Sequence, residues 1–420
     1  MKVCVIGNGG REHALAWRLS ISPSVTKVYA IPGSAAMSDC AELVGIDWQQ
    51  SDHLISFLKE NQVDLVVVGP EAPLVAGLAD VLNKAGIPVF GPSKAAAQLE
   101  GSKVFAKDLM KKYNIPTAAY GVFHKVDEAK AFIAQTGAPI VVKADGLAAG
   151  KGVVVAMTID EANVAVEDML SGNRFGDAGS TVVIEEFMEG EEASLLAFVD
   201  GKTVVPMIAS QDHKRIFDGD KGANTGGMGT YAPAPVLTDA LRDEAMKTIL
   251  EPIVAAMEKE GMPYVGCLYA GLMITDEGPK VVEFNARFGD PETQVVLPLL
   301  DSDLGQIMMA CAKGTLTADM VKWKDSSAAC VILASKGYPE TSSKGDVISG
   351  DIKQYDTTIV FHSGTKLVGE NYVTNGGRVL GVVGLGKDLR TALDRAYGRI
   401  AHIDFEGMQY RTDIGAKAFK

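Results

Sequence analysis

The sequence predicts a multidomain protein of mixed α/β and α+β class, with a doubly wound parallel sheet at its N-terminal end. Strand and helix patterns alternate over residues 1–102, as they do in repeated βαβ units. In the middle of the chain, apolar strand runs are joined by glycine-rich turns, a pattern typical of antiparallel sheets. The length of 420 residues is enough for about three domains.

The N-terminal elements are apolar runs that end at turn residues. Strands are expected at residues 3–6, 27–31 and 64–68, and the last is a continuous apolar run, as a strand buried on both faces requires. Helices are expected at residues 52–60, from the helical spacing of the apolar side chains, and at residues 73–85. A parallel sheet of this kind binds its ligand at the carboxyl ends of its strands.

The middle and last regions supply the remaining elements. Middle strands are expected at residues 140–143, 153–156, 181–186, 194–199, 203–209, 267–274 and 280–285, and helices at about 159–170 and 238–259. From about residue 326, strands at 328–334, 358–362 and 378–384 precede a helix at about 388–401. The sequence shows no internal repeat.

The composition is that of an ordinary globular protein and argues against nucleic-acid binding. The formal net charge is −13 and the pI is about 5.0, whereas a protein that binds a phosphate backbone shows a basic patch. The five cysteines are dispersed and form no C-x-x-C pair, so a reducing cytoplasmic location is expected, without a disulfide framework or zinc site. No apolar run reaches the ~18 residues of a membrane helix, and the first run is too short for a signal peptide. A monomer is expected, and an oligomer stays open.

A strand that ends in polar chemistry is the most informative part of the chain. Side chains alternate along a strand, so Glu283, Asn285 and Arg287 are expected on one face and Phe284 on the other. Carboxylate and amide oxygens suit Mg²⁺, which usually keeps waters and substrate phosphates as its other ligands. Arg287 beside them suits a phosphate or a developing oxyanion. The alternative is a surface strand whose charges pair with one another.

The first glycine-rich turn, residues 7–10, follows a strand and opens a helix. Its backbone N–H groups suit a phosphate or another small polar ligand. A dinucleotide fingerprint needs a glycine where Glu12 stands and an acid after the second strand, where Ile31 and Pro32 stand instead. These departures argue against a nicotinamide or flavin site. The alternative is a turn that only lets strand and helix pack.

A second glycine-rich segment, residues 143–152, joins two expected strands. It is not a P-loop, because Val153 occupies the Ser/Thr position. Its small residues allow it to fold over a triphosphate as a lid, and Lys143 would supply a charge for the phosphates. A plain mobile turn is the alternative, and the presence of the Glu283 strand favours the ligand-binding interpretation.

Further polar segments follow other strands. The adjacent acids Glu185 and Glu186 face opposite sides of a strand whose end could offer its backbone to an adenine edge, with Glu192 at the ribose; alternatively, one acid is simply solvated. Residues 210–215 and 224–229 are polar and glycine-rich and flank an expected loop. No histidine has metal-ligand spacing with another or a triad-like setting, so covalent hydrolase chemistry is set aside.

Taken together, these segments resemble the phosphoribosylamine–glycine ligase (glycinamide ribonucleotide synthetase) family of the ATP-grasp superfamily. The matching stretches are residues 5–14, 68–74, 99–103, 142–152, 210–215, 224–229, 283–294 and 374–378. The first and last lie outside the ATP-grasp core that many ligases share. The resemblance implies a Rossmann-like domain at 1–102, an ATP-grasp region at 103–325 with a mobile lid at about 120–188, and a small C-terminal α+β domain at 326–420.

The resemblance also implies ligation of glycine to 5-phosphoribosylamine, driven by ATP, in purine biosynthesis. The ATP site would comprise Lys103, Lys143, Gly146, Gly150, Lys151, Gly152, Glu185, Glu186, Phe187, Met188 and Glu192. Glu283 and Asn285 would bind Mg²⁺ or Mn²⁺, and the catalytic residues would be Arg287, Lys143 and Asp212. The substrates would contact Gly9, Gly10, Arg11, Glu12, Glu71, Asp212, Lys214, Asn224, Thr225, Gly226, Arg287, Asp290, Pro291, Lys366, Gly377 and Arg378.

The groups present suggest how such a reaction would proceed. The glycine carboxylate would attack the γ-phosphorus, and the amine would then attack the glycyl phosphate while Arg287 stabilises the oxyanion. We hypothesise that Arg378 and Lys366 close over the phosphate of phosphoribosylamine, while residues 9–12 and Glu71 hold its ribose and amine. The alternative is that both cations are solvated surface charges.

Two other function classes stay open. One is an ATP-grasp carboxylate–amine ligase with a different amine, and the other is a catalytically idle nucleotide-binding sensor. The presence of Glu283, Asn285, Lys143 and Arg287 argues against the sensor. Residues 268–274 lack the acid that many ATP-grasp enzymes carry on this strand, which leaves the number of metal ions open.

Overall fold

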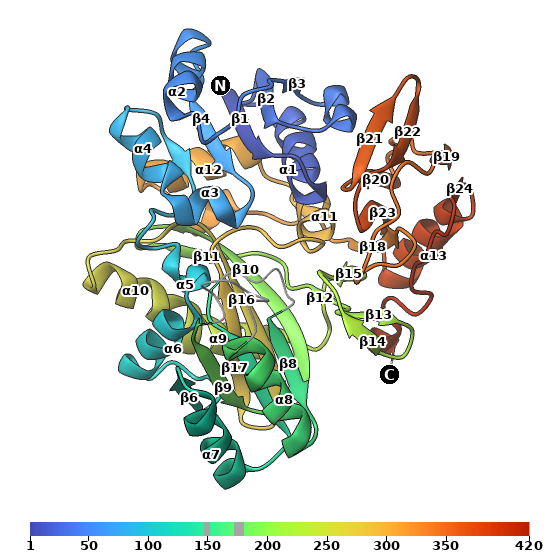
Figure 1. The fold of residues 1–420 in the computed structure, drawn as a ribbon. Coiled ribbons are helices and arrows are strands. Elements are labelled where there is room, and N and C mark those ends of the chain that lie inside the picture. Colours follow the sequence, from blue (N-terminus) through green and yellow to red (C-terminus); the bar gives the residue numbers. More distant parts are fainter. Residues whose placement is uncertain (147–151, 172–179, 420) are drawn as a thin grey trace.

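The computed structural model describes residues 1–146, 152–171 and 180–419 and begins with a five-stranded parallel sheet (Figure 1). The strand order is β3-β2-β1-β4-β5, with neighbours joined in parallel register, so the predicted doubly wound domain is confirmed. Its strands are β1 (Lys2–Gly7), β2 (Lys27–Pro32), β3 (Glu42–Leu43), β4 (Leu65–Val68) and β5 (Val89–Phe90). Its helices are α1 (Gly10–Ser20), α2 (Ser51–Glu60), α3 (Glu71–Ala76) and α4 (Leu78–Lys84).

The prediction of a single helix at residues 73–85 is wrong. Two helices, α3 and α4, meet at Gly77, whose φ of 97° lies in the left-handed region. Glycine adopts this conformation without steric cost, so it ends one helix and lets the next begin. Helix α3 begins at Glu71, shortly after β4 ends at Val68, so Glu71 lies at the ligand edge of the sheet.

A four-stranded antiparallel sheet forms the lower left of the molecule (Figure 1). Its order is β6-β9-β7-β8, with β6 at Tyr120–Phe123, β7 at Ile140–Ala144, β8 at Val153–Ala156 and β9 at Val182–Glu186. Helices α7 (Val126–Thr136) and α8 (Ile159–Leu170) pack on it and form a separate hydrophobic core that includes Ile133 and Val166. This unit therefore carries its own core within the expected lid, whose status as a lid stays a prediction.

A second antiparallel sheet lies at the centre, in the order β11-β10-β16-β17. Its strands are β10 (Glu191–Asp200), β11 (Val204–Pro206), β16 (Val265–Thr275) and β17 (Gly278–Asn285), and a tight turn joins the last two, as predicted. In β10, Leu195 belongs to one core and Leu196 to another, so both faces are covered. The covering helices are α5 (Gln98–Gly101), α6 (Lys103–Lys112), α9 (Asp239–Ala245), α10 (Glu251–Lys259) and α12 (Leu304–Lys313).

The C-terminal sheet draws strands from both sides of the expected boundary at residue 326. Its order is β12-β15-β18-β23-β20, and α13 (Leu389–Ile400) packs on it. The strands are β12 (Gln211–Asp212), β15 (Gly229–Ala232), β18 (Ser327–Ala334), β20 (Thr358–His362) and β23 (Arg378–Gly386). Because β15 pairs with β18, the polar segments around Asp212 and Gly226 lie where the middle and C-terminal parts join.

Short elements complete the chain. The two-stranded sheets pair β13 (Arg215–Phe217) with β14 (Lys221–Asn224), β21 (Thr365–Val368) with β22 (Asn371–Thr374), and β19 (Ser349–Gly350) with β24 (Ile403–Asp404). Helix α11 spans Thr293–Val296, a π-helical turn at Met246–Leu250 joins α9 to α10, and 3₁₀ turns lie at Ala35–Asp39, Leu297–Leu299, Ala318–Met320 and Ala416–Phe419. No helix among the described residues has the length and apolar character needed to cross a membrane.

Candidate active site

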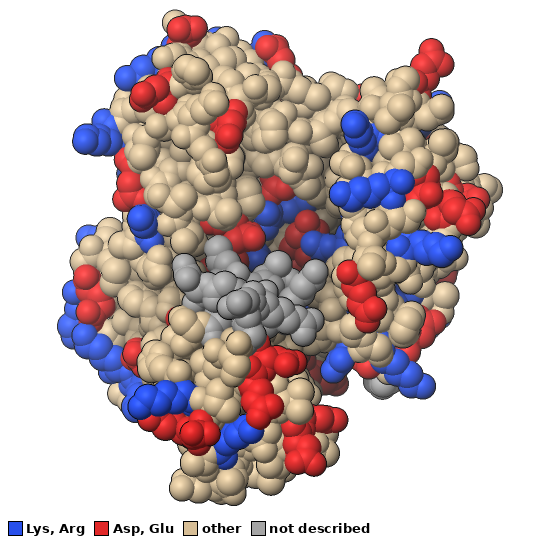
Figure 2. All heavy atoms as spheres, in the orientation of Figure 1, with Lys and Arg blue, Asp and Glu red and all other residues tan. Residues whose placement is uncertain are grey.

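Charged side chains of both signs gather in a central hollow where the three parts of the molecule meet (Figure 2). The end of β17 contributes Glu283 and Asn285, which pair with Gly271 and Tyr269 of β16. Phe284 between them is buried in the core, so the predicted alternation of faces is confirmed. Burial opposes the charge of Glu283, but Lys214, Lys143 and Lys103 outweigh it and lower the pKa of this carboxyl group. The strand therefore ends in an ionised carboxylate and an amide.

A buried carboxylate lies between two lysines beside this strand. The Nζ atom of Lys143 donates to Glu185 Oε2 at 2.9 Å and to the carbonyl oxygen of Val282 at 3.2 Å. Lys107 Nζ lies 3.1 Å from the same Glu185 oxygen, and burial lowers the pKa of Lys107 to about 8 against the opposing charge of Glu185. Lys107 is a site residue that the sequence analysis missed, although its i, i+4 spacing from Lys103 on one helix was a usable signal.

Lys103 connects helix α6 to the glycine-rich segment. Its Nζ donates to the carbonyl oxygen of Gly146 at 2.9 Å, and its backbone N–H donates to Asp145 Oδ1 at 2.6 Å. The backbone N–H of Val104 reaches the same oxygen at 3.2 Å. The Asp145 carboxylate thus caps the N-terminus of α6, where free N–H groups favour a negative charge. Gly150 and Lys151, which the sequence placed in the ATP site, lie outside the described residues, whereas Gly152 is buried.

One prediction about β9, the strand expected to border the adenine, is confirmed: its two adjacent acids face opposite sides. Glu185 is buried and Glu186 is exposed, so the two acids do face opposite sides. Phe187 and Met188 follow as half-buried residues, and Glu192 lies exposed at the start of β10.

Arg287 lies just beyond the end of β17 and is held by two carboxylates. Its NH2 group lies 2.8 Å from Glu100 Oε1 and its Nε 3.4 Å from Glu71 Oε2. Burial disfavours the guanidinium charge, but Glu100 and Glu71 outweigh burial and raise the pKa of Arg287. Glu71 comes from α3 of the N-terminal domain, so Arg287 joins that domain to the central sheet. Glu100 had no role in the sequence analysis.

The first glycine turn is filled by a side chain of the same helix. Glu12 Oε2 accepts the backbone N–H of Gly9 at 2.7 Å, and Glu12 Oε1 lies 2.5 Å from Arg11 Nε. A Cβ atom at Gly7 or Gly69 would collide with the Glu12 side chain. Glu12 therefore caps α1 in a space that the glycines leave open. Gly10 approaches Ser363 of the C-terminal part, and Arg11 NH1 donates to the carbonyl oxygen of Phe288 at 3.2 Å.

Asp212, at the end of β12, and Lys214, which precedes β13, form an ion pair. Asp212 Oδ2 lies 2.6 Å from Lys214 Nζ. Burial alone would lower the pKa of Lys214, and the Asp212 charge raises it well above its ordinary value. Thr225 binds back to the carbonyl oxygen of Lys214 through its hydroxyl at 2.8 Å, which brings residues 224–226 beside this pair. Close by, Tyr269 donates to Glu292 at 2.7 Å, a buried pair that the sequence analysis also missed.

Arg378 of β23 reaches across to both other segments. Its NH1 group donates to the carbonyl oxygens of Gly226 at 2.8 Å and Asp290 at 2.7 Å, and its NH2 lies 3.5 Å from Asp290 Oδ2. Pro291 packs close to Gly227, and the carbonyl oxygen of Gly377 accepts the backbone N–H of Ser335 at 2.8 Å. The alternative that Arg378 is a solvated surface charge is therefore wrong.

Lys366 is placed differently from Arg378. It lies exposed on the β21–β22 hairpin and forms no ion pair with any residue that the structure describes. The structure thus does not bring Lys366 and Arg378 together through a direct contact.

Two antiparallel sheets of four strands each, with Lys143 and Glu185 on one and Glu283 and Asn285 on the other, are the arrangement of the ATP-grasp class of enzymes, and the ATP-grasp family profile matches this region. Family profiles agree with this assignment over nearly the whole chain. The N, ATP-grasp (A) and C domains of phosphoribosylglycinamide synthetase match residues 1–100, 101–293 and 328–417. The chain belongs to the phosphoribosylglycinamide synthetase, or phosphoribosylamine–glycine ligase, family.

Relatives of known name cover the full chain. The phosphoribosylamine–glycine ligase of Halalkalibacterium halodurans is 53% identical over 418 residues, which is 100% of this chain and 97% of the relative. The enzyme of the same name from Neisseria meningitidis serogroup A is 53% identical over 420 residues and is covered to 99%.

Solved structures show the same architecture. The phosphoribosylamine–glycine ligase of Thermotoga maritima superimposes with a TM-score of 0.87 at 33% identity, covering 99% of this chain and 100% of that one. The biotin carboxylase domain of Hydrogenobacter thermophilus 2-oxoglutarate carboxylase, solved with MgADP, has a TM-score of 0.75 at 16% identity, covering 97% and 91%. At 16% identity, the similarity to the biotin carboxylase domain establishes only a shared fold.

Proposed function

We propose that this protein joins glycine to 5-phosphoribosylamine in purine biosynthesis, forming glycinamide ribonucleotide, ADP and phosphate. The observation that carries the proposal is the convergence of Lys103, Lys143 and Glu283 on one hollow that Arg287 and Glu71 also border. Positive groups for a triphosphate and a carboxylate for a metal thus lie beside the N-terminal domain, whose strand ends suit a second substrate. The names of the full-length relatives support the same reaction.

In this proposal the nucleotide lies between the two antiparallel sheets. Lys103 and Lys143 hold its phosphates. The glycine-rich segment that the sequence predicts as a lid includes residues 147–151, which lie outside the described residues. Lys143 already reaches Glu185 at 2.9 Å, so the lysine is held in place before a nucleotide arrives. The strand end at 185–188 faces the adenine, and Glu192 the ribose.

The end of β17 fits a divalent cation. Glu283 and Asn285 offer hard oxygen atoms two residues apart, and neither accepts a hydrogen bond from the residues that the structure describes. No cluster of three or more His, Cys, Asp or Glu residues suited to a metal occurs in the described part of the chain. A site with two protein ligands is one that Mg²⁺ or Mn²⁺ completes with phosphate oxygens and waters, and the bound ion would neutralise charge on the transferred phosphoryl group.

The reaction then needs no nucleophilic side chain. The glycine carboxylate attacks the γ-phosphorus of ATP, the bond to the β-phosphate oxygen breaks, and glycyl phosphate and ADP form. The amine of phosphoribosylamine attacks the acyl carbon, phosphate leaves, and the amine loses its extra proton. Arg287 stabilises the oxyanion, and Lys143 and Asp212 complete the catalytic set. A closed lid keeps water from the acyl phosphate.

Phosphoribosylamine is proposed to bind between the N-terminal and C-terminal parts. Arg378 lies at this junction, held by the carbonyl oxygens of Gly226 and Asp290, and would supply positive charge for the substrate phosphate. Residues 9–12 and Glu71 would hold the ribose and amine. We propose that the protein acts as a monomer, and the five free cysteines support a cytoplasmic location.

Phosphate release tests the proposal and its rivals together. The purified protein with ATP and Mg²⁺ should release phosphate only when glycine and phosphoribosylamine are both present. Release with glycine and another amine instead would identify a different carboxylate–amine ligase. ATP binding with no release under any combination would favour the nucleotide-binding sensor.

A further inference from the structure

The hairpin of β13 and β14 has little core of its own. Most of its residues are exposed, and only Ile216 is buried from it, in a small cluster with Met228 and Ala334. A two-stranded hairpin of this kind is marginally stable in isolation. Both of its ends nevertheless run into proposed substrate-binding residues, since Lys214 precedes Arg215 and Asn224 ends β14.

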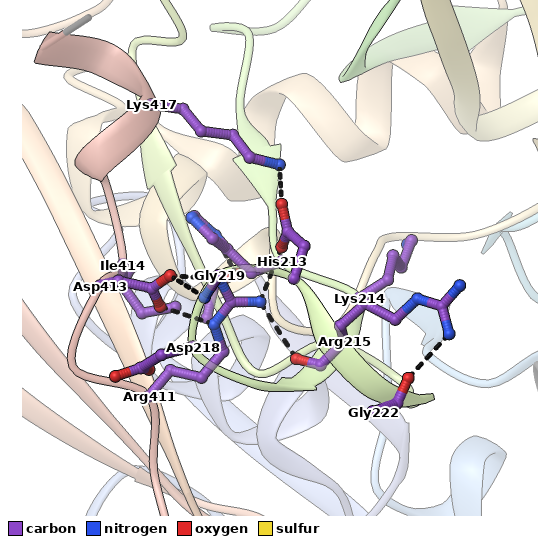
Figure 3. Close-up of polar contacts among 12 residues, drawn as sticks. His213, Lys214, Arg215, Asp218, Gly219, Gly222, Arg411, Asp413, Ile414 and Lys417 are labelled. Carbon is purple, nitrogen blue, oxygen red and sulfur yellow. Dashed lines mark hydrogen bonds and ion pairs between the residues drawn. The ribbon is translucent and has the colours of Figure 1, made fainter.

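Arg411, near the C-terminal end of the described chain, lies against this hairpin with a fully buried side chain (Figure 3). Its NH1 group donates to the carbonyl oxygen of Arg215 at 3.1 Å and to Asp220 Oδ1 at 2.9 Å. Its Nε and NH2 groups form a paired contact with the two oxygens of Asp413, at 2.7 and 2.8 Å. One guanidinium thus binds both the strand and the turn of the hairpin.

Each residue of the turn at 218–220 has a partner in the same tail. Asp218 accepts the backbone N–H of Thr412 at 2.9 Å and also binds its hydroxyl. The backbone N–H of Gly219 donates to Asp413 Oδ2 at 2.8 Å. Lys417 Nζ lies 2.7 Å from Asp220 Oδ2, and Figure 3 marks this contact of Lys417 with a dashed line. The turn therefore depends on the tail for its polar contacts.

The tail also reaches the residue between the two members of the Asp212–Lys214 ion pair. The backbone N–H of Gly415 donates to His213 Nε2 at 3.3 Å, and His213 Nδ1 lies 3.2 Å from the carbonyl oxygen of Gly229 on β15. Nε2 accepts a hydrogen bond, so the ring is neutral with its proton on Nδ1. Burial, followed by the charge of Arg411, lowers the pKa of His213 to about 4, which keeps this arrangement at neutral pH.

We propose that residues 411–417 form a clamp, with Arg411 as its central positioning residue, that sets the β13–β14 hairpin and thereby the substrate-binding segments at Asp212–Lys214 and Asn224–Gly226. The clamp rests on the proposed function for the identity of those substrates. The contacts of Lys103, Lys143 and Glu185, which are proposed for ATP, are made with other residues than 411–417. Among the residues proposed for ATP, Glu192 lies within electrostatic reach of Lys417, whose charge opposes the rise that burial causes in the pKa of Glu192. Loss of the clamp should therefore change the kinetics for glycine and phosphoribosylamine and leave the KM for ATP unchanged.

Two arginines of the C-terminal part, the buried Arg411 and the half-buried Arg399, provide a matched comparison. Arg411→Gln removes the clamp contact. Arg399→Gln removes an equivalent paired contact, in which Arg399 lies 2.5 and 2.9 Å from Asp351 and donates to the carbonyl oxygen of Lys353 at 2.7 Å, away from the hairpin. The full-length variants should be compared at a temperature at which thermal unfolding shows both to be folded.

Steady-state kinetics and hydrogen exchange then decide the matter. Arg411→Gln should lower kcat/KM for glycine or phosphoribosylamine by about ten- to a hundredfold, as a misplaced contact segment does, with the KM for ATP unchanged. Amides of residues 215–224 should lose protection in this variant. Arg399→Gln should show neither effect. Asp220→Asn should reproduce the Arg411→Gln pattern in weaker form, since Lys417 and Arg411 both lose a charged partner.

Several outcomes would overturn the clamp. Normal kinetics with normal protection in Arg411→Gln would do so, and so would an equal loss in Arg399→Gln or a parallel rise in the KM for ATP. If the unmodified protein released no phosphate with its three substrates, the proposed function would fail instead, while the exchange comparison would still decide whether the tail holds the hairpin.

Discussion

Glu283 keeps its negative charge in a half-buried position because it lies among cations. Lys214, Lys143 and Lys103 all lower the pKa of this group and together outweigh the effect of burial. A group of this kind is ionised at neutral pH and suits a divalent cation that arrives with a nucleotide. Removal of the Glu283 charge should therefore reduce the rate of the reaction far more than the stability of the fold.

We expect Glu283→Gln to abolish turnover while leaving the fold intact. The amide has nearly the same shape, but the loss of one charge from the proposed metal site should raise the activation barrier by several kcal/mol, on the order of what a Lewis-acid metal supplies. Phosphate release at varied Mg²⁺ concentration and circular dichroism measure the two effects. Glu277→Gln is the control, because Glu277 is exposed on the turn of the same hairpin. Near-normal Mg²⁺-dependent activity in Glu283→Gln would remove the metal assignment.

A second residue-scale prediction concerns Arg378. A charge-assisted hydrogen bond to a phosphate contributes roughly 1.5–3 kcal/mol. Arg378→Ala should therefore raise the KM for phosphoribosylamine by about ten- to a hundredfold, with the KM values for ATP and glycine little changed. Lys366→Ala should have a smaller effect, because Lys366 lies exposed on a separate hairpin. A shift confined to the KM for ATP would reassign the C-terminal part.

At the scale of elements, the start of α6 is where the central sheet and the β6–β9 unit are joined. Asp145 follows β7 and accepts backbone N–H groups of Lys103 and Val104 at the helix start. Lys107, one turn further along, lies 3.1 Å from Glu185 on β9. The helix thus contacts the sheet of β6, β7, β8 and β9 through its N-terminus and the Lys107 side chain. Both contacts lie next to the proposed phosphate site.

We predict that Asp145→Ala weakens both stability and ATP binding. Loss of a capping carboxylate should cost ~1 kcal/mol, as at other helix N-termini, and Lys103 should lose its fixed position beside Gly146. Asp388→Ala removes a comparable cap, where Asp388 accepts the backbone N–H of Thr391 at 2.8 Å at the start of α13. Urea unfolding should show similar losses for both variants, whereas calorimetry with an ATP analogue should show weaker binding only for Asp145→Ala. Equal ATP affinity in the two variants would contradict the coupling.

At the scale of the whole molecule, the N-terminal domain and the C-terminal sheet meet where α1 contacts β20. The backbone N–H of His362 on β20 donates to His13 Nδ1 at 3.0 Å, and Gly10 approaches Ser363. Burial, then the charge of His362, lowers the pKa of His13 to about 3, and burial lowers the pKa of His362 to about 4. With His213, the fold holds three neutral, buried histidines, each with a pKa below the ordinary value of 6.5.

Stability should therefore fall on acidification in a defined window. Because the unfolded rings bind protons below about pH 6.5 and the folded rings do not, the stability that these groups support is complete above that pH and is lost as pH falls towards 4. Three such rings give a slope of about 4 kcal/mol per pH unit at its steepest. Urea unfolding between pH 4.5 and 7 measures this slope. His362→Gln should reduce it, whereas the exposed His53→Gln should not; a slope equal in both variants would contradict the assignment.

Much of the fold could be predicted because strand and helix periodicity is a local property of the chain. The continuous apolar run at 64–68 and the turn at Thr275–Gly278 each specify their element without reference to distant residues. The helix break at Gly77 was missed, because the apolar pattern continues through it and only the backbone shows the left-handed turn. The strand expected at 203–209 is shorter in the structure. Regular pairing with β10 covers Val204–Pro206, and only isolated contacts, such as the Ser194–Ser210 bridge, follow it.

The sequence by itself determined the architecture of the parallel domain, the polar end of β17 and the family to which the chain belongs. Tertiary structure alone decided that β15 pairs with β18, that Arg287 is held by Glu100 and Glu71, and that Arg411 binds a hairpin almost two hundred positions earlier in the chain. The reason is physical. Periodicity and turn chemistry act between neighbours, whereas the partner of a buried charge is chosen by whichever opposite charge the packed elements bring within hydrogen-bond distance.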